Sequence, residues 1–143
     1  MTRGASVGRD TRFPSEGELP TTWVFEPILR AFILTSQGTA PLPEFFAVLE
    51  EVLAHPKAGH RLRILIDNRM IPAPTSEIVR EGLSRLAGYA DRLENATIMF
   101  VVPGTHDHGI GRLATQMLEG RIEVEVFNDM AAAVTSLAMD EQD

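Results

Sequence analysis

Residues 63–103 read RILIDNRMIPAPTSEIVREGLSRLAGYADRLENATIMFVVP, two apolar runs on either side of an amphipathic segment. The first run ends at Asp67 and the second covers residues 96–102, and continuous apolar runs of this length are typical of strands buried on both faces. The segment between them, from about residue 75 to 92, has helical periodicity. We therefore predict two neighbouring parallel strands in the interior, joined by a helix whose inner stripe is Val79, Leu83, Leu86, Ala90 and Leu93.

The segments before this unit predict a hairpin and a helix. Residues 22–26 (TWVFE) and 29–38 (LRAFILTSQG) favour strands, and Pro27 lies between them, where it can end the first strand. Residues 41–56 place their apolar side chains on one helical face, and Pro56 ends that pattern. The hairpin adds antiparallel pairing to an otherwise parallel sheet.

The segments after the unit repeat the alternation of helix and strand. A one-faced helix is predicted around residues 110–118, followed by IEVEVF at 122–127, whose alternation of apolar and acidic residues indicates an edge strand. Asn128 or Asp129 is expected to cap a last helix. The predicted fold class is α/β: a single mixed, mostly parallel sheet of about five strands with an N-terminal hairpin, covered by about four helices.

Length and composition limit the organisation and the partners. The 143 residues suit one domain, predicted at 22–139, with a flexible tail at 1–21 and a short C-terminal tail at 140–143. The net charge of -7 disfavours binding to nucleic acid, and no apolar run is long enough for a membrane span. The absence of cysteine fits a reducing compartment, and the first residues lack the apolar segment of a secretory signal, so we expect a cytoplasmic protein.

Three features in this order resemble a known family. They are RILID followed by a loop and a helix, VVP followed by GIGRLATQML, and the closing VFNDMAAAVTSL. Together they are similar to the STAS domain superfamily, and within it to the SpoIIAA-like branch. The resemblance implies a regulatory or protein-interaction module of the kind found in anti-sigma-factor antagonists, which are switched by phosphorylation of a serine after the third strand. Distant structural relatives of this branch bind lipids in an apolar pocket.

The sequence Thr75-Ser76-Glu77 has two interpretations. Thr75 is placed where a helix N-cap belongs, and Glu77 in the first turn suits the helix dipole. A phosphate on Ser76 would add charge and bulk to a docking surface. The switchable members place the acceptor serine close behind the Asp that ends the strand, whereas here two prolines separate Asp67 from Ser76. We expect Thr75 to be structural and Ser76 to be the better candidate for a switch.

A shared crevice is predicted where the third and fourth strands end, because ligands collect at the carboxyl ends of parallel strands. Residues 67–77 would form one side of this docking edge and residues 105–112 the other. Its candidate residues are Asp67, Thr75, Ser76, Glu77, Thr105 and Arg112. The alternatives are local roles. Asp67 could accept backbone N–H groups in its own loop, Thr105 or Asp107 could cap the following helix, and Arg112 could simply be solvated.

Metal, cofactor and catalytic motifs are weak. His106 and His108 lie two apart, so in an extended segment their side chains point to opposite sides, and no third histidine has suitable spacing. GIGR lacks the third glycine and the Lys-Ser/Thr of nucleotide loops. We therefore expect no metal site, no cofactor and no catalytic residues.

The sequence thus predicts a non-enzymatic, cytoplasmic regulatory or protein-interaction module whose partner is another protein, with a homodimer among the open alternatives. The second hypothesis is a binder or carrier of a small apolar or lipid-like ligand, held between helices and sheet. A carrier needs a cavity of about 300 Å³ or more. Because each helix has one apolar stripe matched to the sheet, we expect a filled core and no large cavity beneath the helix that begins at Leu42.

Overall fold

The computed structural model describes residues 11–12, 21–38, 41–59, 61–72, 75–103, 107–118 and 121–141. Its sheet contains six strands, of which the first has only two residues, and four helices are assigned in the described ranges. The elements in chain order are β1 (Thr11–Arg12), β2 (Thr21–Glu26), β3 (Ala31–Gln37), α1 (Leu42–Ala54), β4 (Arg63–Met70), α2 (Ser76–Ala87), β5 (Thr97–Val101), α3 (Asp107–Leu118), β6 (Glu123–Phe127) and α4 (Met130–Glu141).

The strands lie in the sheet in the order in which they occur in the chain, β1-β2-β3-β4-β5-β6. β1, β2 and β3 pair antiparallel, whereas β3, β4, β5 and β6 run parallel. In the interior, Ile64 pairs with Ile98 and Ile66 with Phe100, which confirms the predicted parallel neighbours. β6 is at the edge, as its alternating sequence predicted.

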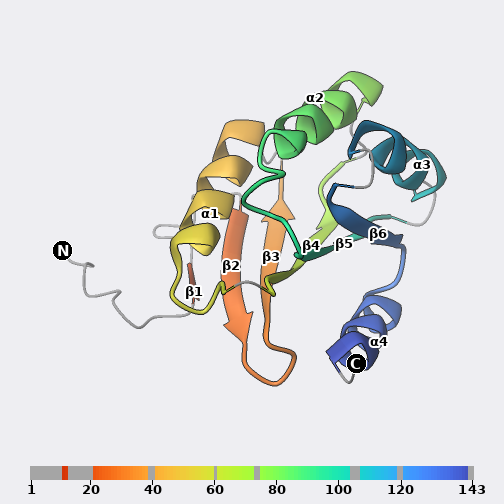
Figure 1. Ribbon diagram of the computed structural model, residues 1–143. Helices are drawn as coiled ribbons and strands as arrows, with labels where there is room; N and C mark the ends of the chain where they lie inside the picture. Colours follow the sequence, from red (N-terminus) through yellow and green to blue (C-terminus); the bar gives the residue numbers. More distant parts are fainter. Residues whose placement is uncertain are drawn as a thin grey trace.

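Three helices cover one face of the sheet and one helix covers the other (Figure 1). Parallel neighbours joined by right-handed crossovers place all the connecting helices on one side, which explains the position of α1, α2 and α3. We call this the three-helix face, and its core includes Ile64 and Ile66 of β4. α4 follows the last strand and packs on the opposite side, the α4 face, against Leu65, Met99 and Val101.

The ends of the domain differ from the prediction. Residues 11–12, assigned to the flexible tail, form β1 and pair with Trp23 and Val24 of β2. α4 extends to Glu141 and so includes two residues that were assigned to the C-terminal tail. Neither segment has the apolar periodicity on which the predicted elements were based. Strand pairing and the last turn of a helix do not require such a pattern.

The predicted helix at 75–92 is also shorter in the structure. α2 ends at Ala87, and the chain then makes a series of turns through residues 88–95. Ala90 and Leu93 are buried in these turns rather than on the helix. The turns are closed by short backbone hydrogen bonds, such as the one from the Leu93 N–H to the Tyr89 carbonyl at 2.9 Å.

Candidate functional site

A pocket of about 380 Å³ lies on the three-helix face, between α1, α2 and the ends of β4 and β5. It is open on one side. Its walls are mainly aliphatic and aromatic. The aliphatic and aromatic side chains that α1 and α2 supply are Leu42, Phe45, Phe46, Ile78, Val79, Leu83 and Leu86. This volume contradicts the expectation of a filled core beneath α1. An apolar stripe looks the same in the sequence whether it meets another side chain or borders an open space, so the pattern could not distinguish the two.

Polar contacts connect α1 to the chain near the end of α2, beside the pocket. Near the end of α2, the Tyr89 hydroxyl donates to the Glu50 carboxylate at 3.0 Å, and Arg92 forms two further hydrogen bonds with it, at 3.0 and 3.1 Å. The Tyr89 ring also stacks on Phe46, with centroids 5.6 Å apart. α2 also packs against α3. Among the described residues, the start of α1 and the start of α2 border the open space of the pocket.

The polar groups in the pocket wall are few. Ser36 of β3 is buried, and its hydroxyl is within hydrogen-bonding distance of the Thr21 hydroxyl at 3.0 Å. Asn68 of β4 is half-buried and also lines the pocket. Thr75 is the third, at the beginning of α2. Ser36 is buried, whereas Asn68 is half-buried and Thr75 is exposed, so Asn68 and Thr75 are the polar groups best placed to meet a ligand among the described lining residues.

The mouth of the pocket has an apolar rim. Ile78 lines the pocket although 48% of its surface is exposed, and Ile71 and Pro72 line the same pocket. The exposed part of the Ile78 side chain offers apolar surface that a bound group could remove from water. The rim continues the apolar lining outward and makes the opening itself suitable for an apolar group.

The structure confirms Thr75 as the N-cap of α2. Its hydroxyl accepts a hydrogen bond from the Ile78 N–H at 3.2 Å, and Ser76 is the first helical residue. Thr75, Ser76 and Glu77 are all exposed. The Ser76 hydroxyl is not used by the cap, so the two neighbouring residues have the different local roles that the sequence predicted.

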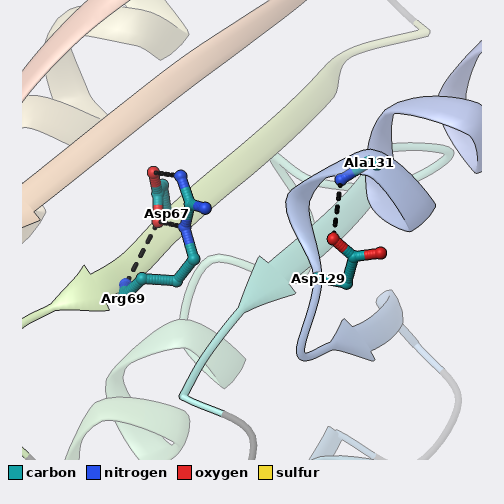
Figure 2. A network of polar contacts seen from close by, with 4 residues as sticks. All are labelled: Asp67, Arg69, Asp129 and Ala131. Atoms are coloured by element: carbon teal, nitrogen blue, oxygen red, sulfur yellow. Dashed lines mark hydrogen bonds and ion pairs between the residues drawn. The ribbon is translucent and has the colours of Figure 1, made fainter.

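Asp67, by contrast, does not face the pocket. It is buried on the α4 face, where its carboxylate accepts the backbone N–H of Arg69 at 3.1 Å and two hydrogen bonds from the Arg69 guanidinium, each 2.9 Å long (Figure 2). The local role considered for Asp67 is therefore the observed one. Successive side chains of a strand point to opposite faces, so Asn68, and not Asp67, lines the pocket.

The charge of Asp67 is stabilised by its partner. Burial would raise the pKa of the Asp67 carboxyl, but the hydrogen bonds and the charge of Arg69 outweigh burial and hold this pKa below its usual value. The pKa of Arg69 is raised, first by its hydrogen bonds with Asp67 and further by the negative charge of Asp129. Asp129 in turn caps α4, because its carboxylate accepts the Ala131 N–H at 3.2 Å, and Figure 2 shows both acids near the end of the sheet.

The remaining predicted residues are either outside the described part of the chain or not among the residues that line the pocket. Thr105 and His106 lie outside the described residues, and the side chain of His108 does as well. α3 begins at Asp107, so this residue is inside the helix and not at the cap position before it. Arg112 is exposed on α3 and is not among the residues that line the pocket.

Two further properties concern the described part of the chain as a whole. Within it, no group of three or more His, Cys, Asp or Glu side chains is arranged to hold a metal ion. None of the helices in the described ranges is both long and apolar enough to cross a membrane.

Comparison of the chain with protein-family models, with characterised proteins and with solved structures finds no match. The pocket and the order of the secondary-structure elements are therefore the basis for the functional argument.

Proposed function

We propose that this protein is a non-enzymatic binding module that holds a small apolar or amphipathic molecule in the pocket between α1 and α2. The observation that supports this proposal is the pocket itself. Its volume of about 380 Å³ is in the range of small-molecule sites, which are concave, mostly apolar and about 300–1,000 Å³ in size. A carrier or sensor of this kind was the second hypothesis from the sequence. Because of the pocket, we now prefer it to the first hypothesis.

The arrangement of polar groups defines the class of ligand. Phe45, Phe46 and Leu83 offer apolar surface in the interior, whereas Asn68 and Thr75 belong to the segments at either end of the β4–α2 loop. A ligand with an apolar body and a hydrogen-bonding end would bury the first and leave the second near Asn68 and Thr75. Removing apolar area from water would supply most of the binding free energy.

The side chains in the described part of the pocket wall support binding without catalysis. Of the hydroxyl groups in the pocket wall, Ser36 is paired with Thr21 and Thr75 accepts the N–H of Ile78. No histidine, lysine, aspartate or glutamate is among the described lining residues, so this described part of the wall supplies no general acid or base. We propose that binding requires no cofactor. The cysteine-free sequence favours a reducing compartment, and we place this function in the cytoplasm.

The test uses a hydrophobic probe and a variant that fills the pocket. Gly82 of α2 lines the pocket, and a Cβ placed there would lie 3.5 Å from Leu42, an ordinary contact. Gly82→Leu should therefore occupy the space while the fold is retained. N-phenylnaphthylamine should bind wild type with saturable fluorescence and should bind this variant at least about tenfold more weakly.

Ala132→Leu, which adds a similar side chain at an exposed position of α4, is the matched control and should bind the probe like wild type. Circular dichroism checks the fold of both variants. If Gly82→Leu is folded and binds the probe as well as wild type does, the pocket is not the binding site. Native mass spectrometry of the purified protein would report a retained ligand and the number of subunits in one measurement.

A second candidate is docking of another protein at the mouth of the pocket, as the resemblance to STAS domains suggests. It is favoured by the position of Ser76, which is exposed, is not used by the cap and lies two residues from the exposed Ile78. A phosphate on Ser76 would place negative charge beside an apolar rim and disfavour an apolar partner surface. Affinity capture with Ser76→Asp should lose a specific partner that wild type and Ser84→Asp retain, because Ser84 is exposed on the same helix away from the mouth. Equal recovery by all three proteins would exclude Ser76 as the switch.

A further inference from the structure

The polar groups in the wall of the pocket between α1 and α2 differ in how far their hydrogen-bonding atoms are already used. The Ser36 hydroxyl is within hydrogen-bonding distance of the Thr21 hydroxyl at 3.0 Å. The Thr75 oxygen accepts the Ile78 N–H at 3.2 Å. Among the described residues, the side-chain amide of Asn68 has no such partner, although Asn68 is half-buried and lines the same pocket. The Asn68 amide is therefore available to a ligand.

The backbone on either side of Asn68 is held in place. The register between β3 and β4 shifts between Thr35 and Gln37, at the level of Asn68 in β4. A bulge of this kind bends a strand and re-aims the side chains beside it. Immediately afterwards, the Arg69 guanidinium is bound to the Asp67 carboxylate on the α4 face by two hydrogen bonds of 2.9 Å. Since side chains alternate along a strand, this anchor keeps Asn68 on the three-helix face, beside the pocket.

An asparagine amide has a definite hydrogen-bonding pattern. Its carbonyl oxygen is an acceptor and its NH₂ group, directly beside it, is a donor. A ligand group that also has an acceptor beside a donor can form two parallel hydrogen bonds with it, as the edge of adenine does. A carboxylate has only acceptors and an alkylammonium has only donors, so either ion would satisfy one half of the Asn68 amide and leave the other half unpaired. An unpaired polar group in a partly buried site is unfavourable.

We infer that the ligand of this pocket is a neutral amphipathic molecule whose polar end is a carboxamide, or a similar group with a donor beside an acceptor, and that Asn68 determines this specificity. Both the head group and the role of Asn68 rest on the function proposed above, since they concern the same pocket. The charge of the wall agrees with a neutral ligand, because no acidic or basic side chain is among its described lining residues. The amino end of α2 would favour an anion, but Glu77 in its first turn already supplies negative charge there.

The volume of the pocket limits the length of the apolar part. At about 30 Å³ for each water-sized group, a pocket of about 380 Å³ has room for about a dozen non-hydrogen atoms. An alkyl chain would contact Phe45, Phe46 and Leu83, and its polar end would lie beside Asn68. Decanamide has this size and this head group, and it is the ligand used in the test.

The test is displacement of N-phenylnaphthylamine from the whole chain by decanamide, decanoate or decylamine. The three ligands have alkyl chains of matched length, and at neutral pH the second is an anion and the third a cation. All are used below the concentrations at which they form micelles. We expect decanamide to displace the probe from wild type at a concentration at least about tenfold lower than either ion, because only the carboxamide satisfies both halves of the Asn68 amide.

Asn68→Asp replaces the NH₂ donor with a second acceptor oxygen and hardly changes the shape of the side chain. The order of the ligands should then reverse, with decylamine at least about tenfold more effective than decanamide. The matched control is Asn95→Asp, which makes the same exchange at an exposed position outside the described pocket lining and should keep the order of wild type. Both variants have the same net charge, so a general attraction for cations would appear equally in both. A purely structural role of Asn68 would weaken all three ligands together without reversing their order.

Circular dichroism checks the fold of each variant. If Asn68→Asp does not fold, Asn68→Ala removes both hydrogen-bonding groups and should abolish the preference for decanamide. Equal displacement by the three ligands in wild type, or an unchanged order in the folded Asn68 variant, would overturn the proposed head group, while saturable probe binding would still support the pocket as a binding site. Absence of saturable probe binding to wild type would overturn both.

Discussion

The two faces of the sheet meet their helices in different ways, although β4 contributes to both. On the three-helix face, Ile64 and Ile66 belong to an apolar core that is incomplete at one end, where the pocket lies. On the α4 face, Leu65 is fully buried between two charged side chains of the same strand, Arg63 and Asp67, both of which are also buried. One face therefore combines a mainly apolar lining with open space, and the other combines close packing with buried charge.

The difference shows what each face can do. An open apolar space costs packing energy, since side chains around it lose contacts that a filled core would provide. Such a cost is consistent with a binding role, which is the one proposed for the three-helix face. The charged groups of the α4 face have protein partners, namely Arg69 for Asp67 and the Leu137 carbonyl for Arg63. The first contact lies within β4 and the second joins β4 to α4, and we interpret both as structural.

The largest expected effect tests whether the α4 face is filled and the three-helix face is hollow. Leu65→Ala removes a side chain with no exposed surface and should lower the free energy of unfolding by about 2–5 kcal/mol. Val79→Ala, in the pocket wall, should cost clearly less because that side chain already borders open space. Urea denaturation measures both. Equal costs would mean that the pocket is filled in solution.

The next effect concerns the buried charge. Asp67→Asn removes the ion pair with Arg69 and should cost about 1–2 kcal/mol at neutral pH, since a hydrogen-bonded charge is lost from a buried position. The pKa of Asp67 is lowered by folding, so the stabilisation is fully present above the ordinary pKa of Asp, about 3.9, and is lost as the pH falls through the lower folded value. The difference between wild type and variant should therefore shrink below about pH 4. A difference that grows in acid would contradict this assignment.

The N-cap beside the pocket gives a smaller effect. Thr75→Ala should cost about 0.5–2 kcal/mol, because the Ile78 N–H loses its acceptor. Ser76→Ala should change the free energy of unfolding little, since this hydroxyl is not part of the cap. Thermal denaturation of the two variants side by side provides the comparison, and a larger loss for Ser76→Ala would show that the cap is misassigned.

The smallest expected effect is an increase in stability, whereas the variants above lower it. Gly82 is inside α2, where glycine costs about 0.5–1 kcal/mol relative to alanine. The added Cβ would lie 3.5 Å from Leu42, so Gly82→Ala should stabilise the protein by up to that amount without a clash. It should also narrow the pocket slightly. A destabilised Gly82→Ala would show that α1 and α2 are closer together in solution than this geometry implies.

Much of the fold was predictable because its signals are local. Alternation of apolar runs and amphipathic segments identified the parallel strands, the acidic alternation of residues 122–127 identified the edge strand, and Asp129 was one of two predicted caps for α4. The cap at Thr75 was predictable for the same reason, since it depends on a residue type and on the next few positions of the chain.

The candidate site was less predictable because it depends on distances between elements. The predicted docking edge grouped Asp67 with Thr75, yet the two side chains face different sides of the sheet. The period of two along β4 could have revealed this, because it places Asn68 on the face of Ile64 and Ile66. The pocket had no such signal. Its width depends on the contacts of Glu50 with Tyr89 and Arg92, which are far apart in the sequence.

The strand order has a consequence for folding during synthesis. Each strand pairs with the one immediately before it, so the sheet can grow one strand at a time as the chain leaves the ribosome. α1, α2 and α3 emerge between the strands they cover, whereas α4 emerges after all of them. The apolar side chains of the α4 face, among them Leu65 and Met99, therefore stay uncovered longest. We expect a nascent chain stalled before α4 to be the form most exposed to chaperones and to aggregation.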